Sequence, residues 1–220
     1  MVQILCNEVL KNKIVSNLAR FKRKSLCAEK FRKAAVAVTI VDYQGKGDLP
    51  GLPAGPEDAA ALILTRRSVR LNSHAGQWAL PGGTVDSGEK VQQAALRELE
   101  EEVGLHRLEE KVLGCLDDFI TRSGFCITPV VIWGGLDTNL TPNEEEVASI
   151  HRIPFSELLR SDAPVLDYIV ESEQPILLMP AGDTEIATPT AAILYQFREV
   201  ALLGKKTRVA HFEQPYFAWR

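Results

Sequence analysis

Long apolar runs are missing from this sequence of 220 residues, although 45% of the residues are hydrophobic. No stretch approaches the roughly 20 consecutive apolar residues that a membrane-spanning helix needs. The N-terminal residues also lack the uninterrupted apolar stretch of a signal peptide, so we expect neither a membrane segment nor secretion. With 25% charged residues, the composition is typical of a globular protein that buries a sizeable core.

Cysteine is scarce, with four residues that are scattered along the chain. They are Cys6, Cys27, Cys115 and Cys126. No Cys-x-x-Cys pair and no histidine at zinc-finger spacing accompanies them, so we expect no structural zinc. Cys115 and Cys126 lie in apolar runs and are expected to be buried as small hydrophobic residues. This pattern favours a reducing compartment, the cytoplasm, with the mitochondrial matrix as the alternative in a eukaryote.

Charge is unevenly distributed along the chain. Residues 1–33 hold nine Lys and Arg but only two acids, Glu8 and Glu29. Because the net charge of the whole chain is −4, the remainder carries a net charge of about −11. A basic arm can indicate nucleic acid, an anionic ligand or a mitochondrial presequence. Leu10, Ile14 and Leu18 recur at helical spacing, however, and favour a solvated amphipathic helix. The acidic remainder disfavours extended contact with nucleic acid, so we expect none as a partner.

Hydrophobic periodicity predicts strands interleaved with two substantial helices, and hence an α/β fold in which helices sandwich a mixed sheet. The expected helices are 4–31 (one helix or a pair), 89–103 and 189–203, and the expected strands are 34–42, 60–66, 111–120, 125–134, 144–154, 167–171 and 175–179. We interpret residues 1–33 as a basic helical extension and 34–220 as the main domain. The aromatic C-terminus, with Phe212, Tyr216, Phe217 and Trp219, is expected to dock on the domain or on a second copy in a homodimer.

Two stripes of side chains run along the predicted helix 89–103, on nearly opposite faces. The apolar stripe consists of Leu96, Leu99 and Val103, and the acidic stripe of Glu98, Glu101 and Glu102. Carboxylates on one face repel one another, and their position near the helix C-terminus adds an unfavourable dipole interaction. The alternative interpretation is a plain solvated acidic face, since Glu is a good helix former. A divalent cation would make the same cluster favourable, because hard cations bind grouped carboxylate oxygens.

The stretch 83–105 resembles the Nudix box, in which Gly, Glu, Arg-Glu-aliphatic, Glu-Glu and Gly-aliphatic stand at fixed spacings. The matching residues are Gly83, Glu89, Arg97, Glu98, Leu99, Glu101, Glu102, Gly104 and Leu105. Because every specified position matches, the signal is far more specific than a lone glycine-rich motif. The resemblance implies a Nudix α/β/α sandwich with mixed β-sheet, and a diphosphatase that acts on a nucleoside diphosphate derivative.

The resemblance also assigns roles by position. Glu98, Glu101, Glu102 and the Gly82 carbonyl would bind Mg²⁺ or Mn²⁺. Glu101 or Glu98 would be the general base, with Glu146 as a further candidate that is equally well explained as solvated surface. The remaining roles are structural: Arg97 would orient a carboxylate, Glu89 would hold the loop, and Gly83 and Gly104 would shape the backbone.

A second resemblance narrows the substrate. The segment 62–83 is similar to the one that precedes the box in coenzyme A diphosphatases; the matching residues are Leu64, Thr65, Arg67, Ser68, Leu71, His74, Gly76, Pro81, Gly82 and Gly83. Asn72 and Leu80 depart from that pattern, and helix 189–203 lacks the usual Trp-Gly-Leu-Thr start. Coenzyme A carries a diphosphate and a 3′-phosphate, for which Arg66, Arg67, Arg70 and His74 are the candidate ligands.

We therefore expect hydrolysis of coenzyme A or acyl-CoA to 3′-phospho-AMP and (acyl-)4′-phosphopantetheine. Three alternatives stay open at this point. One is hydrolysis of ADP-ribose, NADH or another nucleoside diphosphate derivative. Another is a catalytically silent module that binds a nucleotide or a protein. The third is removal of an RNA cap, suggested by the basic N-terminal residues alone.

Overall fold

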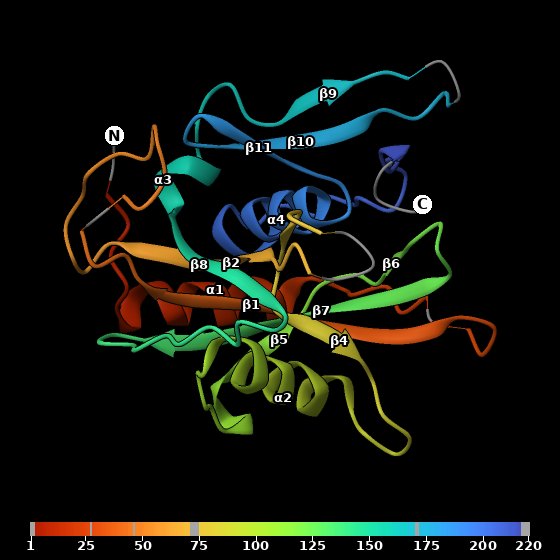
Figure 1. The fold of residues 1–220 in the computed structure, drawn as a ribbon, viewed down its shortest axis with the longest axis horizontal. Helices are drawn as coiled ribbons and strands as arrows, with labels where there is room; N and C mark the ends of the chain where they lie inside the picture. The colour runs from red at the N-terminus through yellow and green to blue at the C-terminus, as the bar shows by residue number, and fades with distance from the viewer. Residues whose placement is uncertain (1–2, 27, 46, 71–74, 170–171, 217–220) are drawn as a thin grey trace.

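A mixed β-sheet forms the middle layer of the computed structural model, which describes residues 3–26, 28–45, 47–70, 75–169 and 172–216 (Figure 1). Along the sheet the order is β3-β2-β1-β7-β5, with β4 paired to β1, β6 to β7 and β8 to β2. Strand β1 is parallel to β7 and antiparallel to β2 and β4. The strands are β1 (Arg32–Asp42), β2 (Ala60–Arg67), β3 (Trp78–Ala79), β4 (Gly82–Thr84), β5 (Val112–Cys115), β6 (Phe119–Ile120), β7 (Phe125–Gly135) and β8 (Val147–Pro154).

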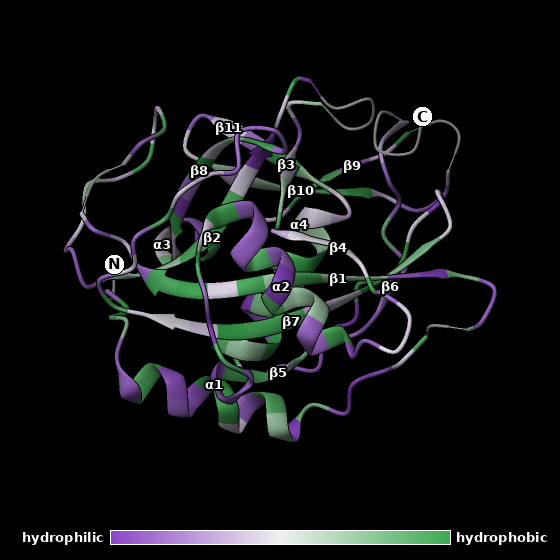
Figure 2. Cartoon of the chain, turned by 60° about the horizontal axis from the view of Figure 1, so that its bottom comes forward, coloured by the Kyte–Doolittle hydropathy of each residue, from purple (hydrophilic) through white to green (hydrophobic). Residues whose placement is uncertain are grey.

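Helices cover both faces of this sheet. One face packs against α2 (Val91–Val103), through Leu99 and Val103 among others. The opposite face packs against α1 (Glu8–Arg20) and α4 (Thr190–Phe197), which continues into a π-helical turn, η2 (Arg198–Leu202). The α/β/α sandwich with a mixed sheet is thereby confirmed. Figure 2 shows the apolar strands between α1 and α2, each of which also carries polar residues.

Smaller elements complete the fold. The turn η1 (Glu109–Lys111) lies beside α2, and the others follow β8: α3 (Phe155–Leu158), β9 (Val165–Asp167), β10 (Ile176–Ala181) and β11 (Thr184–Ala187). Strand β10 pairs with β9 and β11 in a separate small sheet. The predicted hairpin between 167–171 and 175–179 is confirmed as the β9–β10 pair with shifted bounds, whereas β11 was not predicted.

The free edge of β1 is divided between two partners, and this division places the site. Because β7 occupies the whole of one edge of β1, the other edge is left for the antiparallel partners. Ala34–Val36 pair there with β4, and Ile40–Asp42 pair with β2. Strands β4 and β2 separate from each other between these two pairings, and the chain passes from β2 to β4 through β3. Side chains of α2 and β2 meet the β4 backbone at this divided edge.

The N-terminal helix is shorter than the predicted 4–31. It ends at Arg20, and Leu10, Ile14 and Leu18 are buried in the core, so its apolar face packs as expected. The segment after it is held by carboxylates: the backbone N–H of Lys24 donates to Asp117 Oδ1 at 2.6 Å, and that of Leu26 to Asp118 Oδ2 at 2.8 Å. These side-chain acceptors take N–H groups that a helix would need for itself, so the helix prediction for 22–31 is wrong.

The same two aspartates explain why the predicted strand 111–120 is interrupted. Asp117 and Asp118 are buried and separate β5 from β6, both of which pair with β7. The predicted turn at 121–124 is confirmed by Gly124, whose φ of 84° lies in the left-handed region. In the C-terminal region Phe212 packs edge-on to Tyr195, with ring centroids 6.3 Å apart, while Phe217 and Trp219 lie outside the described residues.

Two further expectations meet the structure here. Cys126 is buried, as predicted, and it is also disulfide-bonded, which was not predicted. Cys6 and Cys115 are free, and Cys115 is only half-buried. In the described residues, no helix combines the length and the apolar character that crossing a bilayer requires.

Candidate active site

Glu98 lies directly on the backbone of Gly83. A Cβ added to Gly83 would stand 2.3 Å from Glu98 Oε1, well inside any tolerated contact. Glycine at this position therefore lets a carboxylate from α2 approach the β4 backbone. Glu98 is only 9% exposed, which places its charge at the divided edge of β1 rather than in open solvent.

The polar groups of Gly82 face away from β1. The N–H of Ala37 donates to the Pro81 carbonyl at 2.7 Å, which makes this pair a hydrogen-bonded pair of the antiparallel ladder. The next residue along, Gly82, therefore directs its own N–H and C=O to the open side. The N–H faces the Glu102 carboxylate and lowers its pKa, and the C=O points to the same side.

Arg97 joins the loop after β4 to the helix. Its guanidinium contacts Glu89 Oε1 at 3.1 Å, Glu98 Oε1 at 2.8 Å and Glu101 Oε2 at 3.0 Å. It also donates to the Thr84 carbonyl at 3.0 Å, while Glu89 accepts the N–H of Asp86. Arg97 thus fixes the carboxylate orientation, and Glu89 holds the loop 84–89 on α2.

The acidic stripe is not uniform, since its members differ in exposure. Glu102 is 4% exposed, whereas the side chain of Glu101 is 54% exposed. Burial raises the pKa of Glu102 to about 8, with the charge of Glu98 adding to the rise and Arg67 and the Gly82 N–H opposing it. Burial likewise raises the pKa of Glu98, against the bonds from Arg97. Glu100 points elsewhere, as predicted, and bonds His106 at 2.6 Å.

Two buried carboxylates that repel each other form a donor set for a divalent cation. In the described part of the chain no three Asp, Glu, His or Cys side chains are grouped so that they could hold an ion by themselves. Glu101 is drawn outward to Arg97, which leaves Glu98, Glu102 and the Gly82 carbonyl at the divided edge. Mg²⁺ uses one or two carboxylates and completes its shell with water and phosphate oxygens, so this set fits it.

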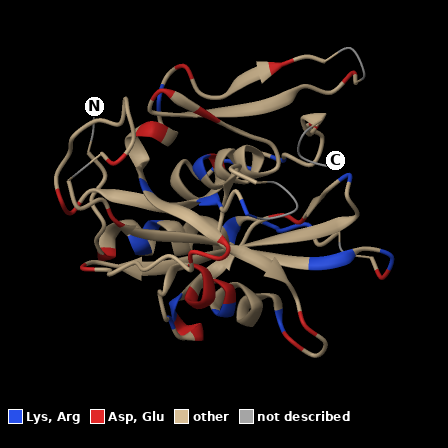
Figure 3. Ribbon diagram, in the orientation of Figure 1, with Lys and Arg blue, Asp and Glu red and all other residues tan. Residues whose placement is uncertain are grey.

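Acidic side chains also gather around this donor set. Figure 3 shows them on α2 and on the loop that leads into β8. Glu146 of that loop is exposed, and its charge raises the pKa of both Glu98 and Glu102. The opposing positive charge on Glu102 comes from Arg67, at the end of β2.

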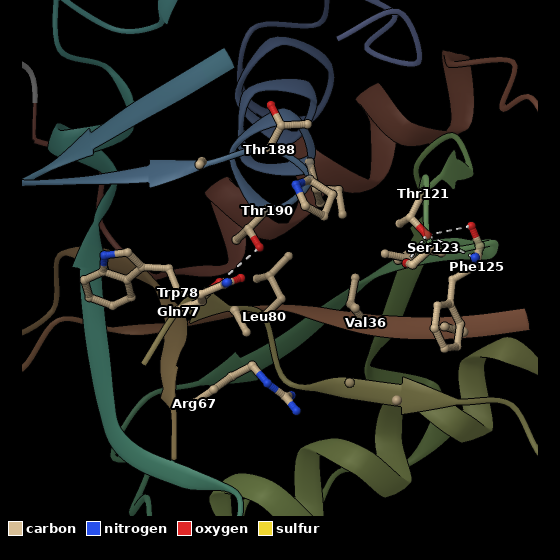
Figure 4. A pocket seen from close by; sticks show the side chains of 18 of the residues that line it. Val36, Arg67, Gln77, Trp78, Leu80, Thr121, Ser123, Phe125, Thr188 and Thr190 are labelled. Carbon is tan, nitrogen blue, oxygen red and sulfur yellow. Dashed lines mark hydrogen bonds between the residues drawn. The ribbon is translucent and has the colours of Figure 1, made fainter. Parts of the chain in front are cut away.

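A cavity of about 420 Å³ begins at this edge and continues beneath α4 (Figure 4). Arg67, Gly82 and Gly83 line its first part. Arg67 Nε is buried and has no hydrogen-bond partner among the described residues. A buried guanidinium nitrogen without an acceptor is costly, so this donor is available to an anionic ligand.

The other predicted substrate residues differ in placement. Arg66 stacks on the Trp78 ring at 3.9 Å and donates to the Gly76 carbonyl at 3.0 Å, so it braces the start of β3 as well as lining the cavity. Arg70 is exposed and is not among the described residues that line the cavity. His74 lies outside the described residues. Trp78 is 8% exposed with its ring between Arg66 and His151, as expected for a core residue.

Sequence reasoning missed the far wall of the cavity. Its roof consists of Ala187, Thr188, Pro189, Thr190 and Ile193, and its outer end of Thr121, Ser123 and Phe125. These residues come from the β11–α4 segment and from the β6–β7 hairpin. No motif marks them, because their sequence reads only as a strand end and an apolar helix start.

Comparison with known proteins agrees with this geometry. The profile of the NUDIX domain matches residues 33–172. Nudix hydrolase NudL of Citrobacter koseri is 47% identical over 132 residues, which is 59% of this chain and 60% of the relative. Nudix hydrolase 3 of Caenorhabditis elegans is 36% identical over 104 residues, or 46% of this chain and 43% of the relative. The chain thus matches about three fifths or less of the length of these relatives.

Solved structures with similar folds are more distant in sequence. The NUDIX domain of Shewanella oneidensis NrtR, complexed with ADP ribose, is 18% identical and has a TM-score of 0.46, over 84% of this chain and 96% of that one. The MutT protein of Methanosarcina mazei Go1 is also 18% identical, with a TM-score of 0.43 over 63% and 83%. Since the profile match covers more than half of the chain, the protein belongs to the NUDIX-domain family.

Proposed function

We propose that the protein hydrolyses the diphosphate bond of coenzyme A or acyl-CoA, releasing 3′-phospho-AMP and (acyl-)4′-phosphopantetheine. The observation that carries the proposal is the position of Arg67. This residue belongs to the segment 62–83 that resembles coenzyme A diphosphatases. Its guanidinium lines the cavity, lowers the pKa of Glu102 by its charge and has an unpartnered Nε. A diphosphate bound there would satisfy the guanidinium and lie next to the carboxylate pair.

The residues that would hold Mg²⁺ or Mn²⁺ are Glu98, Glu102 and the Gly82 carbonyl, joined by Glu101 if it leaves Arg97. Such a cation, when bound, neutralises phosphate charge and favours ionisation of a water molecule. Two half-buried arginines supply the rest of the site: Arg67 binds a phosphate oxygen, and Arg97 keeps Glu98 oriented. Glu101, exposed at the rim, is proposed to accept the proton of the attacking water, with Glu98 as the alternative base.

The reaction is a hydrolysis in which water forms a new bond to one phosphorus. The bond between the bridging oxygen and that phosphorus breaks, and the second phosphate leaves with the electron pair. The negative charge that develops on the phosphate oxygens faces Arg67 on one side. On the other side it faces the cation that the carboxylates would hold. The same geometry supports hydrolysis of ADP-ribose or NADH, so substrate choice rests on the remainder of the cavity.

One competition assay tests the proposal. The purified protein is incubated with Mg²⁺ or Mn²⁺ and an equimolar mixture of CoA, acetyl-CoA, ADP-ribose and NADH, and products are identified by mass. We expect 3′-phospho-AMP to form first, together with 4′-phosphopantetheine species. Faster turnover of ADP-ribose or NADH would replace the CoA proposal by the alternative substrate class. A double variant, E101Q/E102Q, serves as the inactive control for contaminating hydrolases.

A further inference from the structure

We propose that the cavity beneath α4 binds the non-nucleotide half of the substrate, a flexible neutral chain of amides and methyl groups, and leaves the phosphorylated nucleoside outside. This inference rests on the proposed function and deepens it, because it assigns the two halves of the substrate to different surfaces. The roof of this cavity belongs to the β11–α4 segment, beyond the stretch 33–172 that the NUDIX profile matches, whereas its floor and outer end lie within that stretch.

The cations among the described lining residues of the cavity stand at the end of β2, near its mouth. Among its described lining residues the cations are Arg66 and Arg67, and the acid is Glu185. Arg66 is already engaged with Gly76 and the Trp78 ring, which leaves Arg67 for a phosphate of the diphosphate. The described interior offers no cation for the 3′-phosphate of a nucleoside, and burying an unpaired phosphate is strongly unfavourable. A phosphorylated nucleoside is therefore disfavoured there.

The interior instead alternates apolar side chains with hydroxyl groups. Figure 4 shows Val36 and Leu80 beneath Thr190, with Thr121 and Ser123 toward the far end. Thr121 Oγ1 accepts the N–H of Phe125 and lies 3.0 Å from Ser123 Oγ, which can also donate to or accept from a ligand amide.

The aromatic rings of the cavity are poorly placed to stack on a nucleobase. The Arg66 guanidinium lies 3.9 Å from the centre of the Trp78 ring, and the Trp78 and His151 rings make a T-shaped contact. At the outer end, the Arg32 guanidinium lies 3.9 Å from the centre of the Phe125 ring. Each ring thus has a face covered by an arginine. A narrow chain needs no free ring face, whereas a purine in this cavity would need one.

Filling the cavity tests the assignment. Val36→Phe places a larger side chain on its floor, and Val165→Phe makes the same change at an exposed position of β9 outside the cavity. Binding of 4′-phosphopantetheine and of 3′-phospho-AMP is measured separately by calorimetry with Mg²⁺ present. We expect V36F to weaken 4′-phosphopantetheine binding at least tenfold and to leave 3′-phospho-AMP binding within twofold, while V165F changes neither.

A second variant guards against misfolding of the first. Phe125→Ala removes a half-buried ring at the outer end, and we expect about fivefold weaker 4′-phosphopantetheine binding with unchanged 3′-phospho-AMP binding. Loss of 3′-phospho-AMP binding in V36F or F125A, or equal loss of both ligands, overturns the assignment even if the wild-type protein cleaves CoA. Failure of the wild-type protein to cleave CoA overturns the proposed function instead, so the two failures are distinguishable.

Discussion

Gly83 is the residue at which the carboxylate site is most sensitive to substitution. Gly83→Ala would place a methyl group 2.3 Å from Glu98 Oε1 and 2.7 Å from its Cδ, so the carboxylate must move. We expect roughly a 100-fold fall in kcat, because ångström-scale misplacement of a catalytic group has an effect of this order. The measurement is steady-state hydrolysis with Mn²⁺. Gly55→Ala, whose added Cβ makes only ordinary contacts at 3.5 Å and beyond, is the matched control and should retain activity.

Glu102 is expected to act against the stability of the cation-free protein. Its carboxyl is buried beside Glu98, so the charged form is disfavoured there. Glu102→Gln keeps the size and removes the charge. We expect an equal or higher Tm without metal, loss of the Tm increase that Mn²⁺ gives the wild-type protein, and loss of turnover. A variant that keeps the Mn²⁺-dependent Tm increase would contradict the assignment of Glu102 as a ligand.

Some of these residue roles could be predicted from spacing and some could not. Helical periodicity places Glu98, Glu101 and Glu102 on one face, but it treats them alike. Their difference in exposure arises from tertiary contacts: Gly82 and Gly83 close over Glu98 and Glu102, and Arg97 draws Glu101 outward. The unpartnered Nε of Arg67 likewise follows from how the end of β2 packs, which the sequence does not reveal.

Helix α2 positions all three carboxylates, and its C-terminal end is set by Gly104. This residue has a φ of 68°, and its N–H bonds the carbonyls of Glu100 and Leu99. Gly104→Ala forces a Cβ into the left-handed region and to 3.2 Å from the Thr141 carbonyl, which costs roughly 1–2 kcal/mol. We expect a reduction of that size in the free energy of urea unfolding, with an unchanged m-value. An unchanged midpoint would show that this end of the helix contributes nothing to stability.

Elements with strong periodicity could be predicted, and those set by long-range contacts could not. Strands β1, β2 and β8 and helix α2 lie close to their predicted positions, because their apolar residues follow the strand or helix period. Strand β11 has too short a pattern to recognise, and it exists because it pairs with β10. The predicted helix 189–203 changes to a π-helical turn at Arg198, a change that no local preference indicates.

The N-terminal and C-terminal segments belong to the layers of the whole molecule. Asn17 Nδ2 of α1 donates to the Ala201 carbonyl at 2.8 Å, and Arg208 contacts Asp117 Oδ1 at 2.6 Å. Residues 1–33 therefore do not form a detached arm over their described part; α1 lies in the same layer as α4. Proposals of a homodimer through the aromatic C-terminus or of a particular cellular compartment stay predictions.

Acid should loosen the C-terminal segment before the core. The bond from Arg122 lowers the pKa of Glu213 to about 2, from an ordinary value of 4.5. Because the folded pKa is the lower one, this pair stabilises the fold above pH 4.5, and its contribution is lost as the pH falls from 4.5 toward 2. Arg122 is half-exposed, so solvent screening keeps the effect small. Glu213→Gln should remove this part of the difference in unfolding free energy between pH 6 and pH 3, measured by urea titration; an unchanged difference would refute it.

The divided edge of β1 also means that two short pairings, with β4 and with β2, stand where a single longer strand could pair along the whole edge. If one continuous strand paired with β1, the Gly82 amide and carbonyl, which face away from β1, would pair with a further strand or be covered. The opening at which the charge of Arg67 acts on Glu102 would then be closed. Mutations selected only for a more regular sheet should therefore raise the free energy of unfolding and abolish turnover of substrate. In this molecule, the N–H and C=O of Gly82 can serve either the reaction or a regular β-ladder, but not both.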